Sequence, residues 1–403
     1  MREMDRRTCL RLLAGAAVAA VSCTRPGDYT DEEAAALERQ IQTERAASGK
    51  GPYGPLQFRG YRGLAALPYF EVGSDGFLRV RVAGIPRFVD FHAHLGMNFL
   101  LAPDLDLLRR TPRIQYMLDC DRDDPGCRLD LDVYINSAFT PETHGELEHE
   151  AQGQLLFGSA AAATHTIPNL LAEMDAIGCE RVNILPIAAG LPFGDDLTER
   201  WLAAIRAAHA GDRLTPFASV HPSDGRWRER LRAAAAAGVK GLKVHPEMQR
   251  LFPDEPDMLP VYAECERLGL VVIFHAGRSG IEPTFMRKYA LIRRYAGAVR
   301  AFPRVQFVMG HAGARDVADA MELARACPNV WLEITGQGVT QLDRIITQVG
   351  SERLLFGSDW PFYPLAATLA KVLLVTEQRP EARTAILRGN AERVFALAAG
   401  TQA

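Results

Sequence analysis

Short apolar runs recur along the chain from residue 88 onward, and each of them ends in polar side chains. The longer stretches between them carry apolar residues at helical spacing. A continuous apolar run of this length is typical of a strand that is buried on both faces, as in a parallel sheet. We therefore predict eight buried strands, at residues 88–94, 181–187, 214–221, 241–245, 270–275, 305–311, 330–335 and 354–359.

The intervening stretches predict eight helices, at residues 167–177, 197–210, 227–237, 258–268, 284–302, 314–326, 342–349 and 365–376. Several of them end at a glycine directly before the next strand, which is a common way to end a helix. Eight strands that alternate with eight helices predict a (β/α)8 TIM barrel of the α/β class. The rival is a doubly wound open sheet, which is disfavoured because no Gly-x-Gly-x-x-Gly loop follows an early strand.

The barrel domain is expected to span residues 67–398, followed by a tail at 399–403. Two short apolar segments around Ser74-Asp75-Gly76 predict a β-hairpin before the first barrel strand. The gap between the first two barrel strands is much longer than an ordinary loop. We therefore expect residues 95–165 to form an insertion over the mouth of the barrel.

Residues 1–22 have the pattern of an export signal. Arg6 and Arg7 precede an apolar run that is too short to span a bilayer, in an order that resembles a twin-arginine signal. The sequence before Cys23 resembles a lipobox, in which Cys23 would carry a lipid anchor; cleavage without lipidation is the alternative. Residues 23–66 would then be a tether. The protein is expected in the bacterial cell envelope, either periplasmic or anchored by its lipid.

The composition is that of an ordinary soluble protein, with 403 residues, 48% of them hydrophobic, and a net charge of −3. No basic block is present, which argues against a nucleic-acid partner. Contact with a membrane is expected only through Cys23, and a homo-oligomer is compatible with the composition.

In an oxidising compartment, Cys120 and Cys127 are expected to form a disulfide around a polar turn. The acidic stretch at 119–124 is interpreted as solvated, because its spacing does not match an EF-hand loop.

Histidines gather at the carboxyl ends of the predicted strands. Alternation along the first strand puts His92 and His94 on one face, which by itself is weak evidence for a metal site. Further strands end in His221, His245, His275, His311 and Asp359. Because the active site of such a barrel lies at the carboxyl ends of its strands, these residues together predict a metal site at one rim.

Several motifs occur in a characteristic order: His92-x-His94, Gly-Leu-Lys243-Val-His245-Pro, Phe-His275-Ala-Gly, Gly-His311-Ala-Gly, Gly-Ser-Asp359-Trp-Pro and Gly389-Asn-Ala-Glu-Arg-Val-Phe395. With these motifs, the chain from about residue 88 to about residue 398 resembles the amidohydrolase superfamily, in its amidohydrolase-2 branch.

The resemblance implies that His92, His94 and His275 bind one divalent metal ion and that Asp359 is its carboxylate ligand. Three imidazoles and a carboxylate favour Zn²⁺ and leave a position for water. Asp359 would also accept the proton of that water. His311 would act as a base beside the metal, with a role as a further ligand as the alternative.

Other residues at the rim have alternative roles. In binuclear relatives a lysine on the fourth strand is carboxylated and bridges two metals, so a second metal at Lys243 is an alternative to the single ion. We interpret His245 as a residue near the metal, and Glu333 as a buried residue that supports the ligands. Arg278 would either bind a substrate carboxylate or lie in solvent on its loop.

The first functional hypothesis is a metal-dependent hydrolase, in which a metal-bound hydroxide attacks the carbonyl of an amide, a lactone or another ester of a small substrate. The second is nonoxidative decarboxylation of a small unsaturated or aromatic acid, because the branch includes enzymes similar to aminocarboxymuconate semialdehyde decarboxylase. A non-catalytic envelope lipoprotein that binds a ligand is the third, and the intact set of ligands argues against it.

Overall fold

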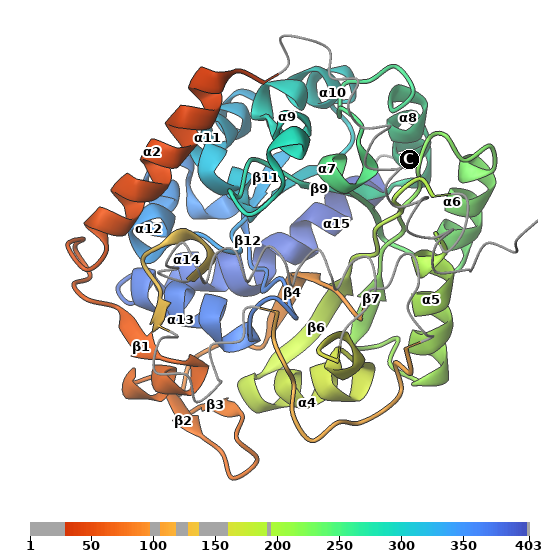
Figure 1. The fold of residues 1–403 in the computed structure, drawn as a ribbon. Coiled ribbons are helices and arrows are strands. Elements are labelled where there is room, and N and C mark those ends of the chain that lie inside the picture. The colour runs from red at the N-terminus through yellow and green to blue at the C-terminus, as the bar shows by residue number, and fades with distance from the viewer. Residues whose placement is uncertain (1–28, 97–104, 118–127, 137–159, 192–194, 401–403) are drawn as a thin grey trace, which may run out of the picture.

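The computed structural model describes residues 29–96, 105–117, 128–136, 160–191 and 195–400 (Figure 1). The expected export signal, the lipid anchor at Cys23, the disulfide between Cys120 and Cys127 and the acidic turn lie outside these ranges. Among the helices within them, none has both the length and the apolar character needed to cross a membrane.

Eight parallel strands form the centre of the fold, in two hydrogen-bonded arcs with the orders β4-β6-β7 and β12-β11-β10-β9-β8. Isolated parallel bridges from Ala93 to Trp360 and from Ala218 to Leu242 join the arcs into a ring. The predicted (β/α)8 barrel is therefore confirmed. Its strands are β4 (Phe88–Ala93), β6 (Cys179–Ile184), β7 (Leu214–Pro216), β8 (Gly241–Val244), β9 (Val271–His275), β10 (Phe307–Gly310), β11 (Val330–Glu333) and β12 (Leu354–Leu355).

Helices surround this ring in Figure 1 and bury their apolar faces against it. They are α4 (Ile167–Ile177), α5 (Leu197–Ala207), α6 (Trp227–Ala236), α8 (Leu259–Leu268), α11 (Val317–Ala326), α12 (Val339–Val349) and α13 (Leu365–Val375). The helix predicted at 284–302 is broken, because Leu291 is extended at ψ 123° between α9 (Arg287–Ala290) and the short turn Ile292–Arg294. A further helix, α10 (Ala296–Ala301), follows that turn.

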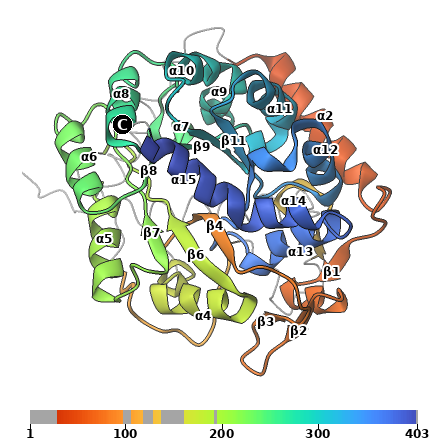
Figure 2. The ribbon, with the colours of Figure 1, turned by 180° about the vertical axis from the view of Figure 1, so that it is seen from behind.

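The barrel interior is filled with apolar side chains below the rim. Phe91 and Phe217 lie edge to face there, at a centroid distance of 6.0 Å. The final helix α15 (Asn390–Gly400) adds Val394 and Phe395 to the same cluster and crosses one end of the barrel in Figure 2. With this end closed by packing, the carboxyl ends of the strands form the opposite, functional end.

Two small antiparallel pairs flank the barrel. The predicted hairpin is confirmed as β2 (Phe70–Val72) and β3 (Leu78–Val80). The second pair was not predicted from the sequence: β1 (Gln57–Arg59) pairs with β5 (Arg128–Asp130). This pairing connects the chain before the barrel to the insertion that follows the first barrel strand.

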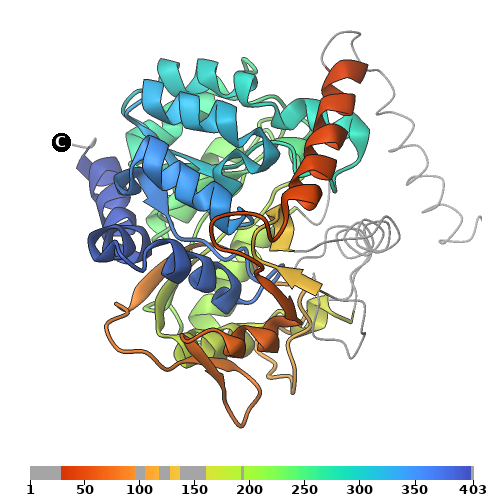
Figure 3. The same ribbon diagram turned by 90° about the vertical axis from the view of Figure 1, so that its left-hand side faces the viewer.

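The N-terminal helix α2 (Asp31–Ala47) packs on the barrel and is not a free tether. Its apolar residues Leu37 and Ile41 lie one turn apart and are 1% and 7% exposed. Glu33 pairs with Arg293, and Glu44 pairs with Arg315. Figure 3 shows α2 at the end of the barrel opposite α15. The expectation of a tether across residues 23–66 is therefore wrong for the described part of that segment, because two apolar contacts and two ion pairs fix the helix.

Candidate metal centre

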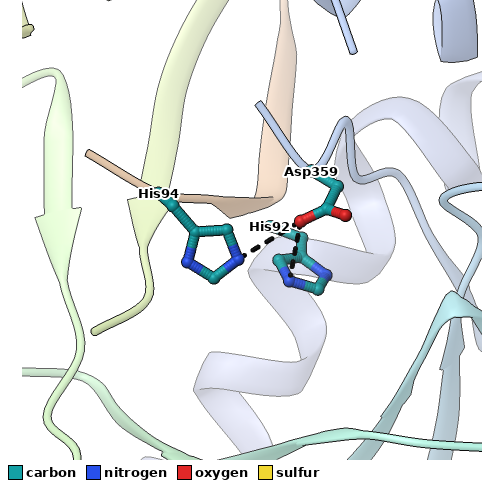
Figure 4. A group of neighbouring side chains, drawn as sticks. All are labelled: His92, His94 and Asp359. Atoms are coloured by element: carbon teal, nitrogen blue, oxygen red, sulfur yellow. Dashed lines mark ion pairs between the residues drawn. The ribbon is translucent and has the colours of Figure 1, made fainter. Parts of the chain in front are cut away.

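Two histidines and one aspartate converge where the first and last barrel strands end (Figure 4). His92 Nε2 lies 3.4 Å from Asp359 Oδ1, and His94 Nε2 lies 3.2 Å from the same oxygen. The backbone N–H of Asp359 donates to His92 O at 2.7 Å, which fixes the two strand ends relative to each other. The structure thus brings together three of the four metal ligands that the sequence predicted.

The outer nitrogens of both histidines have acceptors. His94 Nδ1 lies 2.6 Å from Leu185 O, and His92 Nδ1 lies 2.7 Å from Glu333 Oε2. Because these oxygens accept, each Nδ1 carries the hydrogen and each Nε2 presents a lone pair. Both lone pairs then face Asp359 Oδ1, so three acceptor atoms lie close together. A cation bound between them would stabilise this arrangement. This donor set fits a divalent ion such as Zn²⁺.

Lys243 is fully buried beside this set, and its Nζ lies 3.2 Å from His92 Nε2. Burial lowers the pKa of Lys243 to about 8, against the opposing effect of the carboxylates of Asp359 and Glu333. Burial also lowers the pKa of His92 well below its usual value, and Lys243 lowers it further. The imidazole of His92 is therefore neutral, which is the form that binds a metal.

Glu333 supports two histidines at once. Its Oε2 accepts from His92 Nδ1 and from the backbone N–H of His311, the latter at 3.1 Å. Its Oε1 accepts the backbone N–H of Thr335 at 2.6 Å. Burial raises the pKa of Glu333 to about 7, although these hydrogen bonds oppose the rise. Its position agrees with the supporting role predicted from the sequence.

His275 lies one step further around the rim, outside the converging set. Its Nδ1 is 3.0 Å from His311 Nε2, and its Nε2 is 3.4 Å from Glu247 Oε2. Its ring stacks on that of His245, with centroids 4.1 Å apart and an angle of 5°. His275 as a ligand of the first cluster therefore remains a prediction. Sequence reasoning missed Glu247, although its place two residues after His245 was a signal.

His311 lies between the two groups. Its ring centroid is 5.0 Å from that of His92 and 4.6 Å from that of His275. His311 and Asp359 both have a φ of 58°, in the left-handed region that is unfavourable for residues other than glycine. Gln337 Nε2 stabilises this backbone by donating to His311 O at 2.7 Å. Strained residues of this kind cluster at functional sites, and the sequence did not reveal Gln337 as their support.

Arg278 is not a solvated loop residue. It pairs with Asp316 through Nη2 and Nε, the first at 2.5 Å, and donates from Nη1 to Glu33 O at 3.0 Å. The guanidinium therefore joins the loop after β9, the loop after β10 and α2. The expectation of a solvated Arg278 is therefore wrong, because its partners lie on segments that are distant in the sequence, while the substrate clamp remains a prediction.

A (β/α)8 barrel with paired histidines and an aspartate at the carboxyl ends of its strands defines a metal-dependent barrel enzyme. Residues 89–397 match the model of the family described as amidohydrolase. The chain therefore belongs to the amidohydrolase family. The predicted class, a metal-dependent enzyme of the amidohydrolase type, is confirmed at this level.

Relatives include enzymes and solved structures. The chain is 30% identical over 276 residues to L-fucono-1,5-lactonase from Burkholderia multivorans, a match that covers 66% of this chain and 86% of the relative. The structure is similar to a 5-carboxyvanillate decarboxylase from Sphingomonas paucimobilis, with a TM-score of 0.53, 16% identity and coverage of 77% and 99%. An uncharacterised TIM-barrel protein from Bordetella bronchiseptica gives a TM-score of 0.51 with 20% identity and the same coverage. At these identities, the two structures support the fold alone.

Proposed function

We propose that the protein hydrolyses lactones and that one divalent cation, most simply Zn²⁺, is held by His92, His94 and Asp359. The observation that carries this proposal is the convergence of two imidazole lone pairs on Asp359 Oδ1. A cation bound there would lower the pKa of a water molecule and polarise the lactone carbonyl.

The side chains supply the proton transfers. Asp359 accepts a proton from the attacking water as the oxygen of that water bonds to the carbonyl carbon. The proton taken up by Asp359 then passes through His311 to the ring oxygen as the carbon–oxygen bond breaks, and the product is a hydroxy acid. Burial lowers the pKa of His311 well below its usual value, and this prevents a permanent charge there before the reaction.

The charges of the described rim favour a neutral substrate. Arg278 pairs with Asp316, Arg315 with Glu44, and Arg287 with Glu282 at 3.2 Å. Each guanidinium thus has a carboxylate of the protein as its partner. A lactone carries no charge and does not require a free arginine. The 30% identity to a lactonase supports the same choice.

Decarboxylation of a small acid is the alternative, and one feature favours it. The ammonium group of Lys243 lies beside His92 and provides a positive charge next to the metal ligands. A substrate carboxylate that reached this position would gain an ion pair within the buried site.

The test is a comparison of lactones and aromatic acids as substrates of the purified, zinc-loaded protein. We expect release of acid from six-membered sugar lactones and a loss of at least about a thousandfold in kcat/KM for Asp359→Asn. Asp212→Asn is the matched control, because Asp212 is exposed and lies on the loop after α5. Carbon dioxide release from an aromatic acid without lactone hydrolysis would instead support the decarboxylase.

A further inference from the structure

Tyr134 extends from the insertion to the loops at the far side of the barrel mouth. The N–H of the next residue, Ile135, donates to Gly336 O at 2.9 Å. A Cβ atom added at Gly336 would lie only 2.9 Å from Tyr134 Cε2, so the ring rests directly on this glycine. The guanidinium of Arg315 covers the ring at 4.8 Å from its centroid. The ring therefore has a defined position between the loops after β10 and β11.

The loops that hold the Tyr134 ring follow the strands that lead to His311 and Glu333, so the ring lies on that side of the barrel mouth. Burial raises its pKa well above the usual value, and the carboxylates of Asp359, Glu282 and Glu333 raise it further, while Arg315 opposes them. These three carboxylates follow β9, β11 and β12, which belong to one arc of the barrel. Burial also raises the pKa of Tyr363 well above the usual value, and Tyr134 and Asp359 raise it further.

Both phenols have unused hydrogen-bonding capacity. Tyr134 is 5% exposed and Tyr363 is 4% exposed. Among the residues that the structure describes, neither phenol oxygen has a hydrogen-bonding partner, and neither is a fully buried atom, so each remains accessible to a ligand. A hydroxyl-bearing ligand in the barrel mouth would supply this partner. A charged ligand is not favoured, because the arginines there are already paired with carboxylates of the protein.

The N-terminal helix fixes this tyrosine. Glu44 Oε1 accepts the backbone N–H of Tyr134, and Glu44 Oε2 lies 3.1 Å from Arg315 Nε. On the same helix, Gln40 Nε2 donates to Arg315 O at 2.7 Å. One carboxylate of α2 thus holds both Tyr134 and the guanidinium that covers its ring. This helix lies outside the family match at residues 89–397.

We infer that Tyr134, with Tyr363 beside it, binds the hydroxyl groups of a polyhydroxylated lactone ring, and that Glu44 is the positioning residue for Tyr134. This inference rests on the proposed function for its substrate class. It adds the part of the lactone that is recognised and the residues that recognise it.

The first experiment compares two lactones with the zinc-loaded wild type and Tyr134→Phe. For a six-membered sugar lactone, we expect KM to rise about tenfold while kcat stays within about twofold, because the phenol binds a group that does not react. For δ-valerolactone, which has no hydroxyl groups, we expect no change in either constant. Tyr262→Phe is the control, since the phenol of Tyr262 donates to Pro253 O on the outer side of the barrel.

The second experiment tests the positioning role. Glu44→Gln should raise KM for the sugar lactone but not for δ-valerolactone, and should speed hydrogen exchange of the amides at 131–136. Glu38→Gln is the matched control on the same helix, because Glu38 is exposed and contacts Gln42 within α2. Equal losses on both lactones for Glu44→Gln, with exchange unchanged, would overturn the positioning role.

Binding of a gluconolactam, a polyhydroxylated ring that is not hydrolysed, separates this inference from the proposed function. Calorimetry should show about tenfold weaker binding to Tyr134→Phe than to the wild type, with unchanged binding to Tyr262→Phe. If no lactone is hydrolysed but this difference is seen, the proposed function fails and the recognition by Tyr134 stands. If lactones are hydrolysed but Tyr134→Phe matches the wild type in KM and lactam binding, the inference is wrong.

Discussion

Glu333 Oε2 lies 2.7 Å from His92 Nδ1, and both side chains are completely buried. The same oxygen accepts the backbone N–H of His311, so one carboxylate orients a metal-binding imidazole and anchors the neighbouring histidine loop. Carboxylates in this position set the tautomer of a ligating histidine and raise its basicity. The relationship makes Glu333 the residue through which metal binding can be weakened without removing a ligand.

Replacing Glu333 with glutamine should lower zinc affinity by about 10- to 100-fold, because the amide is a weaker acceptor for the hydrogen on His92 Nδ1. Titration against a competing chelator measures this change. Glu352→Gln is the control, since Glu352 is exposed beyond the end of α12. An affinity equal to that of the wild type would mean that Glu333 does not orient His92 in the metal-bound protein.

Metal stoichiometry should be one ion per chain, and Lys243→Met should leave it at one. The reason is that Lys243 Nζ lies beside His92 Nε2 as a buried donor and is not needed as a ligand. Elemental analysis of both proteins after dialysis gives the ratio. Two ions in the wild type and one in the variant would instead support a carboxylated, bridging lysine.

Arg278→Ala should destabilise the protein by about 3 kcal/mol, because it leaves the carboxylate of Asp316 buried without its main partner. KM for a lactone should change by less than about twofold. Denaturant unfolding measures the loss, and the Arg278→Ala/Asp316→Ala double variant should recover part of it. A large rise in KM with unchanged stability would instead support the hypothesis that Arg278 binds a substrate carboxylate.

Acid should destabilise the protein partly through His165, on the insertion. Burial lowers the pKa of His165 to about 4, while the imidazole of the unfolded chain titrates near 6.5. The unfolded state therefore binds a proton first, and stability that is complete above pH 6.5 is lost as the pH falls towards 4.

This contribution amounts to roughly 3 kcal/mol at most. With a chelator present, His165→Gln should lose less unfolding free energy than the wild type between pH 6.5 and pH 4. Parallel curves for the two proteins across this range would show that the imidazole does not stay neutral in the folded state.

We propose export through the twin-arginine pair. Replacing Arg6 and Arg7 with lysines keeps the charge of the segment and should retain the protein in the cytoplasm. Cell fractionation and immunoblotting measure this, and Cys23→Ala tests lipidation by moving the exported protein from the membrane to the soluble fraction. Unchanged export of the double lysine variant would argue for another route.

The barrel was predictable because its strands are buried on both faces and so appear as continuous apolar runs. The positions of His92, His94 and Asp359 followed from the same observation, since side chains at strand ends meet at one rim. Glu333 was also predictable, as a carboxylate at the end of an apolar strand has few places to lie except beside the site.

Other features depend on contacts that no local pattern contains. The sequence of α2 shows only two apolar positions, Leu37 and Ile41, and its ion pairs join residues about 260 to 270 positions apart. The grouping of His275 with Glu247 depends on side-chain rotation at the rim. For the same reason, the bond from Arg278 to Asp316 could not be read from spacing.

The location of α2 affects how this enzyme can be shortened or diversified. A recombinant form cut to the family boundary near residue 89 would keep every predicted metal ligand and so could still load zinc. It would lose Glu44, and with it the support for Tyr134, so a metal-replete protein could have altered substrate preference. Relatives that differ in this helix could likewise acquire new selectivity while their catalytic barrels stay the same.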